Sequence, residues 1–177
     1  MADWPAKIVE LARLKERIAT LDADGIFPYT LPAVAAPASR LEGFEERTGI
    51  TLDEGHRSFL AAADGWPAFF ETQDLLSLEQ LSGGAHRDAF AGWIESAPPQ
   101  AKAAGYSAAT LLPIAVDLEM PLFAAMPVAN GRVESRVLSL DPSGIIDDYA
   151  SFEEYFDSTI AYTRQNLADF ESGAYRL

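Results

Sequence analysis

The spacing of apolar residues changes along this chain, and that change constrains the fold more than any other feature. In two segments before residue 64, apolar residues recur at intervals of three and four, as on one face of a helix. Between residues 111 and 149 they form short runs separated by turn residues, which is typical of strands. From Ser151 the helical spacing returns. Helices, then a group of strands, then a helix predict an α+β fold.

Capping residues and helix breakers place the predicted elements. Asp3 is suited to cap a helix over residues 4–21, and the prolines of residues 22–38 predict an extended connector that lies on the protein body. Three further helix starts are predicted by capping boxes that begin at Ser39, Thr51 and Ser151. Short helices are predicted at 77–81 and 86–96, strand or loop pieces at 66–70 and 75–76, and strands at 111–116, 121–128, 132–140 and 144–149. Asn130-Gly131 is a hairpin signal.

Composition limits the classes of function. Asp and Glu outnumber Lys and Arg by 27 to 13, and this net charge of −14 argues against binding to nucleic acid or to an anionic membrane. With 49% hydrophobic residues in 177, one domain with a real core is expected. The absence of cysteine excludes disulfides and thiol catalysis. The N-terminal residues predict neither a signal peptide nor a membrane span, so we expect a cytoplasmic protein.

The two histidines, His56 and His86, are the candidates for acid–base catalysis. His56 shares the apolar face of a predicted helix, which favours a core position, and His86 has no recognisable partner in the sequence. The chain has no G-x-S-x-G motif, no metal-binding spacing and no glycine-rich phosphate loop. A hydrolase that uses either histidine stays an alternative, although the residues show no catalytic constellation. Asp147-Asp148 could also reach one cation, but solvated charge is the preferred interpretation of these carboxylates.

Two long stretches contain neither Lys nor Arg. Residues 58–86 hold four acidic residues, and residues 137–163 hold six. If these two basic-free stretches meet in space, they form a surface of one sign that attracts a basic partner. Charge spread evenly over an acidic protein is the alternative interpretation.

The segment LEGFEERTGITLDEGHRSFLAAADG, at residues 41–65, resembles the helical signature of the SUKH superfamily. The branch concerned includes fungal cell-wall-assembly regulators and bacterial immunity proteins. The matching positions are Leu41-Glu42, Gly49, Leu52, Phe59-Leu60 and Asp64-Gly65. Asp53 replaces the usual proline of that signature, and His56 replaces the usual aromatic residue. LLPIA at 111–115 and SFEEYF at 151–156 resemble a strand and the last helix start of the same family.

The resemblance covers residues 39–160 and implies a mixed, twisted central β-sheet flanked by helices. Within one domain, residues 1–38 would add an N-terminal helix and a proline-rich connector, residues 83–107 an insertion, and residues 161–177 a continuation of the last helix. The resemblance also implies an immunity protein that binds and neutralises a cognate bacterial toxin, often a nuclease, without enzymatic activity or cofactor. A regulatory scaffold with a non-toxin partner is the alternative.

Partner-binding residues are expected where aromatic and acidic side chains coincide, because hot spots favour aromatic residues and acids steer a basic partner. One predicted group follows the third helix: Trp66, Phe69, Phe70, Glu71 and Asp74. A second is Asp147, Asp148 and Tyr149. For the aromatic residues, Trp66 above all, a core position is the competing prediction. The expected partner is a basic toxin domain rather than nucleic acid or a membrane.

Overall fold

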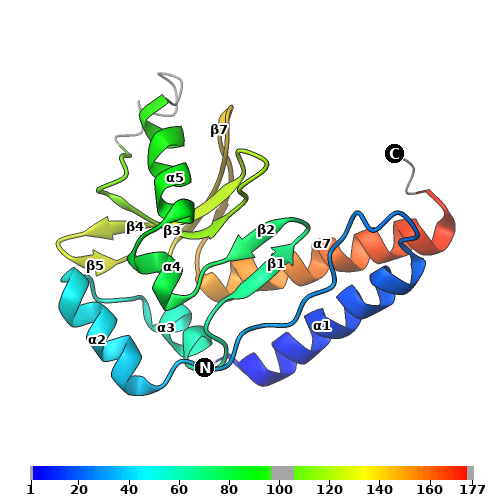
Figure 1. Cartoon of the computed structure of the whole chain (residues 1–177), viewed down its shortest axis with the longest axis horizontal. Coiled ribbons are helices and arrows are strands. Elements are labelled where there is room, and N and C mark those ends of the chain that lie inside the picture. Colours follow the sequence, from blue (N-terminus) through cyan, green and yellow to red (C-terminus); the bar gives the residue numbers. More distant parts are fainter. Residues whose placement is uncertain (1, 97–105, 175–177) are drawn as a thin grey trace.

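The computed structural model describes residues 2–96 and 106–174 (Figure 1). In chain order the helices are α1 (Trp4–Leu21), α2 (Ala38–Thr48), α3 (Glu54–Leu60), α4 (Leu78–Ser82), α5 (Ala85–Ser96) and α7 (Phe152–Ser172). The strands are β1 (Trp66–Phe70), β2 (Gln73–Leu75), β3 (Leu111–Val116), β4 (Phe123–Ala129), β5 (Arg132–Val133), β6 (Val137–Asp141) and β7 (Gly144–Tyr149). The predicted α+β class is confirmed. Parts of the predicted insertion 83–107 and of the predicted continuation 161–177 lie outside the described residues.

The strands form one open, twisted sheet in the order β1-β2-β3-β4-β6-β7, with β5 paired to β4. The strand ladders are antiparallel; Leu112 lies opposite Met126, and Ser139 lies opposite Asp147. Within the described residues, parallel pairing is confined to an isolated bridge between Thr51 and Arg132. Every residue of β3 is buried, which places this strand at the centre of the core.

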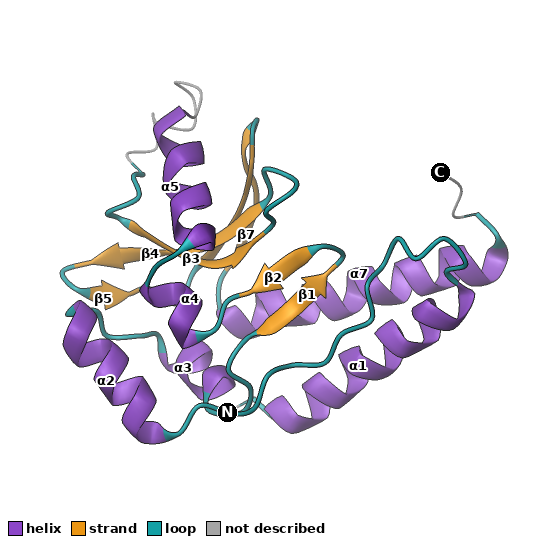
Figure 2. Ribbon diagram, viewed as in Figure 1, coloured by secondary structure: helices purple, strands orange, loops and turns teal. Residues whose placement is uncertain are grey.

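Helices cover both faces of the sheet (Figure 2). On one face lies α7, where the ring of Phe156 is 5.1 Å from that of Phe69 in β1. The helix α1 packs along α7, and Trp4 makes an edge contact of 5.5 Å with Phe156. On the other face α5 places Trp93 4.8 Å from Phe123 of β4. The sheet core is therefore aromatic on both sides, which fixes where α5 and α7 sit.

The connector between α1 and α2 is extended and lies on the protein body, as predicted. Its backbone covers the β1 side of the sheet, since the Ala33 N–H donates to the Gly65 carbonyl at 2.9 Å. The indole N–H of Trp66 also donates to the Thr30 carbonyl at 3.2 Å. At the opposite side, β7 has no further strand beside it among the described residues. An uncovered strand edge is a site where other chains can pair.

Two predicted capping boxes are wrong. The helix α2 begins at Ala38 after Pro37, and no side chain caps it, so Ser39 lies inside the first turn. The helix α3 is capped by Asp53, whose carboxylate accepts the His56 N–H at 3.1 Å. Thr51 instead holds the bridge to β5. A carboxylate two residues nearer the helix displaces the predicted threonine cap, because it reaches the orphan N–H groups directly.

Other start and turn signals are confirmed. Ser77 and Ser151 cap α4 and α7 through their hydroxyl groups. Asn130 and Gly131 have φ values of 52° and 71° and form the turn between β4 and β5. The predicted strand 132–140 is wrong as a single element, because β5 ends at Val133 and β6 begins at Val137.

Gly65 is required where α3 leads into β1. Its φ is +87°, and a Cβ atom there would lie 2.6 Å from the Ser77 backbone nitrogen. No side chain fits in that space, so the Asp64-Gly65 match to the SUKH signature has a structural reason.

Candidate binding site

A cavity of about 190 Å³ opens between the β1–β2 hairpin, the β6–β7 hairpin and α7. This volume is several times the share of one water molecule, about 30 Å³, yet below the roughly 300–1,000 Å³ typical of small-molecule sites. Its lining is aromatic, hydroxyl-bearing or acidic, with Leu122 and Ile146 as aliphatic members and Gln73 as an amide. The residues are Phe70, Gln73, Leu122, Ser139, Ile146, Asp147, Tyr149, Tyr155, Ser158, Thr159 and Tyr162. We call this space the aromatic cavity.

Aromatic rings form the walls of the aromatic cavity. The rings of Phe70 and Tyr162 are 6.1 Å apart, and those of Tyr149 and Tyr155 are 5.6 Å apart in an edge contact. Tyr155 is buried, whereas Tyr162 is 51% exposed and lies at the rim. The two tyrosines on α7 are seven residues apart, with Thr159 between them, so they follow one face of the helix.

Polar groups at the floor of the aromatic cavity are bonded to one another. The Tyr155 hydroxyl donates to Gln73 Oε1 at 3.2 Å, and Gln73 Nε2 donates to the Leu122 carbonyl at 3.2 Å. Burial raises the pKa of Tyr155, so its hydroxyl stays protonated at physiological pH. The floor is therefore neutral and ordered.

The charge in the aromatic cavity comes from Asp147. Burial raises the pKa of the neighbouring Tyr149, and the Asp147 carboxylate adds to that shift. Asp148 belongs to a separate pair, because its carboxylate forms two bonds of 2.6 and 2.5 Å with Arg136. That hydrogen-bonded pairing with Arg136 lowers the pKa of Asp148. Adjacent aspartates on one strand thus have different roles, as the alternation of side chains along a strand requires.

The two basic-free stretches meet at the aromatic cavity. Every lining residue except Leu122 belongs to residues 58–86 or 137–163. Among the described residues, no Lys or Arg lines the space. Several acids of the two stretches are paired elsewhere, as Asp64 is with Arg40 and Asp157 with Lys7, whereas Asp147 lines the cavity without an ion pair among the described residues.

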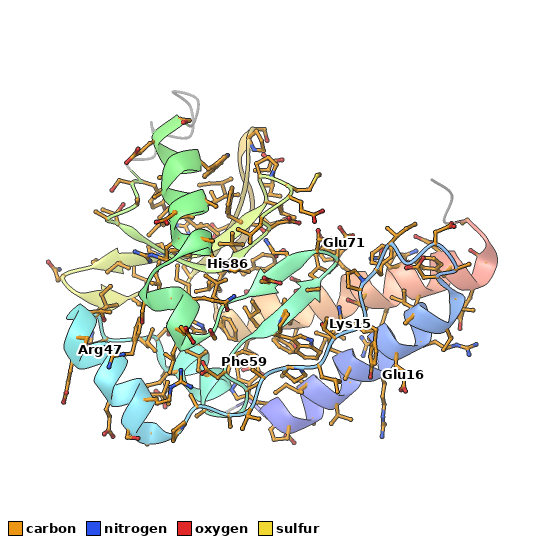
Figure 3. The ribbon with its side chains drawn as sticks, viewed as in Figure 1. Lys15, Glu16, Arg47, Phe59, Glu71 and His86 are labelled. Carbon is orange, nitrogen blue, oxygen red and sulfur yellow. The ribbon has the colours of Figure 1, made fainter. Side chains whose placement is uncertain are left out.

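The structure separates the predicted partner-binding residues into four groups. Phe70, Asp147 and Tyr149 line the aromatic cavity, and Glu71 lies at the tip of the β1–β2 hairpin, exposed on one side (Figure 3). Glu71 also lines the small cavity beside Lys15, where desolvation raises its pKa and nearby Asp117 adds to the shift. Trp66 and Phe69 are fully buried core residues with no surface to offer a partner. Asp74 and Asp148 are each held in a pair with another side chain.

Sequence reasoning missed the α7 contribution. Tyr155, Ser158, Thr159 and Tyr162 form a stripe beside the core-facing residues of that helix. The i, i+4, i+7 spacing of Tyr155, Thr159 and Tyr162 was the available signal, since it places them on one helix face.

Both histidines have structural positions. His56 is fully buried, its ring lies 4.8 Å from that of Phe152, and neither ring nitrogen has a hydrogen-bond partner within the described part of the chain. The predicted core position of His56 is confirmed. His86 Nε2 lies 2.8 Å from the Asp74 carboxylate, whose other oxygen accepts the Ala68 N–H at 2.7 Å. The Asp74–His86 pair therefore ties the β1–β2 hairpin to α5.

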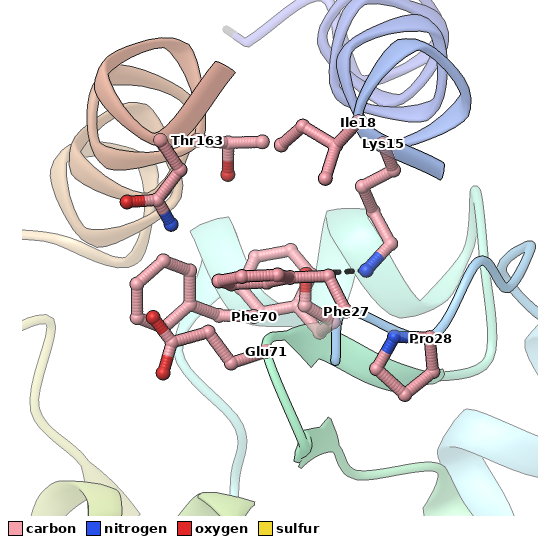
Figure 4. A pocket seen from close by; sticks show the side chains of 9 residues that line it. Lys15, Ile18, Phe27, Pro28, Phe70, Glu71 and Thr163 are labelled. Carbon is pink, nitrogen blue, oxygen red and sulfur yellow. Dashed lines mark hydrogen bonds between the residues drawn. The ribbon is translucent and has the colours of Figure 1, made fainter. Parts of the chain in front are cut away.

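Lys15 is a buried amine with no carboxylate partner among the described residues. It reaches from α1 to β1 and donates to the carbonyls of Ala68 and Phe69 (Figure 4). The adjoining cavity, of about 10 Å³, has room for a single water at most. Ala68 has a φ of +45°, and the β1–β2 register shifts there, which is typical of a β-bulge. Lys15 therefore donates hydrogen bonds to backbone carbonyls of this bulge.

The wild-type protein should become more stable to unfolding as pH rises through the range in which Lys15 titrates, and Lys15→Met should abolish that increase. Desolvation lowers the pKa of Lys15 from 10.5 to about 8. Between these values the unfolded chain binds a proton that the folded chain lacks, so the unfolding free energy increases with pH in that window. We expect the wild-type protein to gain about 2–3 kcal/mol relative to Lys15→Met between pH 7 and 10, measured by urea unfolding. Arg13→Met, exposed on the same helix, is the matched control and should show no such change. A constant difference between wild type and Lys15→Met would contradict the expectation.

No protein-family model matches this chain, and a search of curated proteins finds no match. Within residues 2–96 and 106–174, no helix is long and apolar enough to span a membrane. The same residues contain no cluster of three or more His, Asp or Glu side chains suited to a metal ion. Membership of the SUKH superfamily therefore stays a prediction.

Proposed function

We propose that this protein is an immunity protein that binds a basic bacterial toxin domain stoichiometrically and occludes its active site. The observation that carries the proposal is the aromatic cavity, where two stretches without Lys or Arg meet around four aromatic rings and Asp147. Such a site suits binding rather than catalysis, because hot spots of protein interfaces are aromatic and sit in desolvated pockets. The resemblance of residues 41–65 to the SUKH signature supports the same function.

Exposed apolar residues lie beside the aromatic cavity. Ile146 on β7 is 45% exposed, and Leu118 and Met120 in the β3–β4 turn are 53% and 62% exposed. Leu122, at the end of that turn, shares the aromatic cavity with Ile146, which places the turn beside β7 (Figure 1). Aliphatic and aromatic residues bordered by acids resemble the centre and rim of a protein interface.

The negative net charge of the protein favours one class of toxin as its partner. A net charge of −14 repels nucleic acid but attracts a protein that is itself built to bind phosphates. Nucleases carry such positive surfaces, because phosphate contacts dominate their affinity for nucleic acid. A nuclease toxin therefore fits the proposed partner best, and acids near the interface would raise its association rate.

The toxin domain encoded by the adjacent gene provides the test. We expect a 1:1 complex by calorimetry, inhibition of the toxin's activity, and an affinity that falls steeply with salt. Tyr162→Ala should weaken the complex by about tenfold or more, as expected for a rim hot spot. Tyr29→Ala, also exposed but on the connector, is the matched control. An adjacent gene that encodes no toxin, or a toxin that does not bind, would refute the proposal and favour a scaffold with another partner.

A further inference from the structure

We infer that the aromatic cavity receives the guanidinium group of an arginine from the partner. The inference deepens the proposed function, and it relies on that function only for the identity of the protein that supplies the arginine. It rests on the ring geometry, the charge and the hydrogen-bond inventory of the cavity.

The ring geometry suits a flat cation. Phe70 and Tyr162 form one pair of rings, Tyr149 and Tyr155 form another, and both pairs line the same space. A guanidinium stacks on aromatic faces and is attracted by their quadrupoles, and this is worth about 0.5–2 kcal/mol per contact. With Tyr162 at the rim and Tyr155 at the floor, a long side chain can enter from the surface.

The charge of the site is uncompensated. Asp147 is the one carboxylate in the lining, and it has no ion pair among the described residues. Nearby cations are engaged elsewhere: Arg136 pairs with Asp148, Lys15 bonds to backbone carbonyls, and Arg164 pairs with Glu10. A cation from another molecule could therefore pair with Asp147 without displacing one of these side chains, whereas an anion would be repelled by Asp147.

The hydrogen-bonding groups of the aromatic cavity favour a ligand that has donors and no acceptors. The hydroxyl of Ser158 donates to the Tyr155 carbonyl at 2.7 Å, and that of Thr159 donates to the same carbonyl at 3.2 Å. The Tyr155 hydroxyl and one N–H of the Gln73 amide are also used as donors within the protein. The three hydroxyls have only lone pairs left, which accept, whereas Gln73 keeps one further N–H. Guanidinium has five N–H donors and no acceptor, so it complements these groups, and its planar fork matches a carboxylate in two bonds.

Lysine satisfies the charge less well than arginine does. Its ammonium is a compact, strongly hydrated point charge that neither stacks on rings nor binds a carboxylate in two parallel bonds. A single carboxylate with aromatic walls also lacks the ligands for a hard metal ion, which takes several oxygens. The aromatic cavity should therefore prefer a cation to an anion, and arginine to lysine or a metal ion.

Hexapeptides of arginine, lysine and citrulline provide the test with the full-length chain. Citrulline has the shape of arginine without its charge. By calorimetry at physiological salt, we expect hexa-arginine to bind about tenfold or more tightly than either of the other two peptides. Asp147→Asn should weaken hexa-arginine binding about tenfold, and Tyr162→Ala about threefold or more.

Glu79→Gln is the matched control, because it removes one exposed carboxylate from the same basic-free stretches without releasing a paired cation and without touching the cavity. It should change the affinity less than about twofold, and thermal unfolding should show all three variants folded. Equal weakening by Asp147→Asn and Glu79→Gln would show that only the net charge matters and would overturn the inference. Equal affinity for hexa-lysine or hexa-citrulline would overturn it as well.

The two proposals fail in different experiments. If hexa-arginine binds as expected while the adjacent toxin does not, the immunity function is refuted and the arginine site stands. If the toxin binds Asp147→Asn as tightly as wild type and hexa-arginine does not bind, the arginine site is refuted and the immunity function stands.

Discussion

Trp66→Ala is expected to lower the free energy of unfolding by about 3–5 kcal/mol, because it removes a fully buried indole from the core. The ring lies 5.8 Å from that of Phe69, and its N–H donates to the Thr30 carbonyl. The variant therefore loses packing and also leaves a carbonyl of the connector without its donor. Urea unfolding followed by circular dichroism measures the loss.

This result would separate core residues from binding residues within one predicted group. Tyr162→Ala is the matched substitution on the surface, and we expect it to change stability by about 0.5 kcal/mol or less while it weakens partner binding. If Trp66→Ala instead retains wild-type stability and loses binding, Trp66 contacts the partner and its buried position in the free protein does not describe the complex.

His56→Phe is expected to abolish an acid-dependent loss of stability. Burial lowers the pKa of His56 from 6.5 to about 4, against a smaller opposing effect of Asp53. Between pH 6.5 and 4 the unfolded chain binds a proton at this ring that the folded chain excludes. The unfolding free energy of wild type therefore falls with pH in that window, by about 3 kcal/mol in total. Above pH 6.5 this contribution is fully present.

The Phe variant has no titrating group at this position, so the difference between the two proteins should grow by about 3 kcal/mol from pH 7 to 4. The His56→Phe substitution should also be well tolerated at pH 7, because it removes two ring nitrogens that have no hydrogen-bond partner among the described residues. Unfolding in urea at pH 4, 5.5, 7 and 8.5 measures the difference, and the interval from 7 to 8.5 serves as the internal control. A difference that does not vary with pH would contradict the buried, neutral state of His56.

The sequence predicted the elements well where a local signal decides the structure. The turn at Asn130-Gly131 and the cap at Ser151 depend on residues within four positions, and both are confirmed. The capping boxes at Ser39 and Thr51 failed because neighbouring residues take the cap positions. Asp53 caps α3 while Thr51 forms a bridge to β5, and α2 begins directly after Pro37.

The site was predicted in part, because burial on β1 does not follow simple alternation. Trp66 and Phe69, three residues apart, are both fully buried, and Phe70 lines the aromatic cavity. The bulge at Ala68, which Lys15 satisfies from a helix far away in sequence, changes which side chains face the core. No pattern in the sequence near Ala68 indicates its contact with Lys15. Residues of the two stretches without Lys or Arg do meet, since together they supply every lining residue of the cavity except Leu122.

The packing of α1 against α7 has a consequence for synthesis of the protein. Trp4 contacts Phe152 and Phe156, so α1 packs against a helix that is synthesised much later. At about 5–20 residues per second, the segment between Trp4 and Phe152 takes roughly 7–30 s to translate. During that time the apolar stripe of α1 has no α7 to cover it. The wall that Tyr155 and Tyr162 supply is also missing until α7 emerges, so the cavity cannot form before α7 has been synthesised.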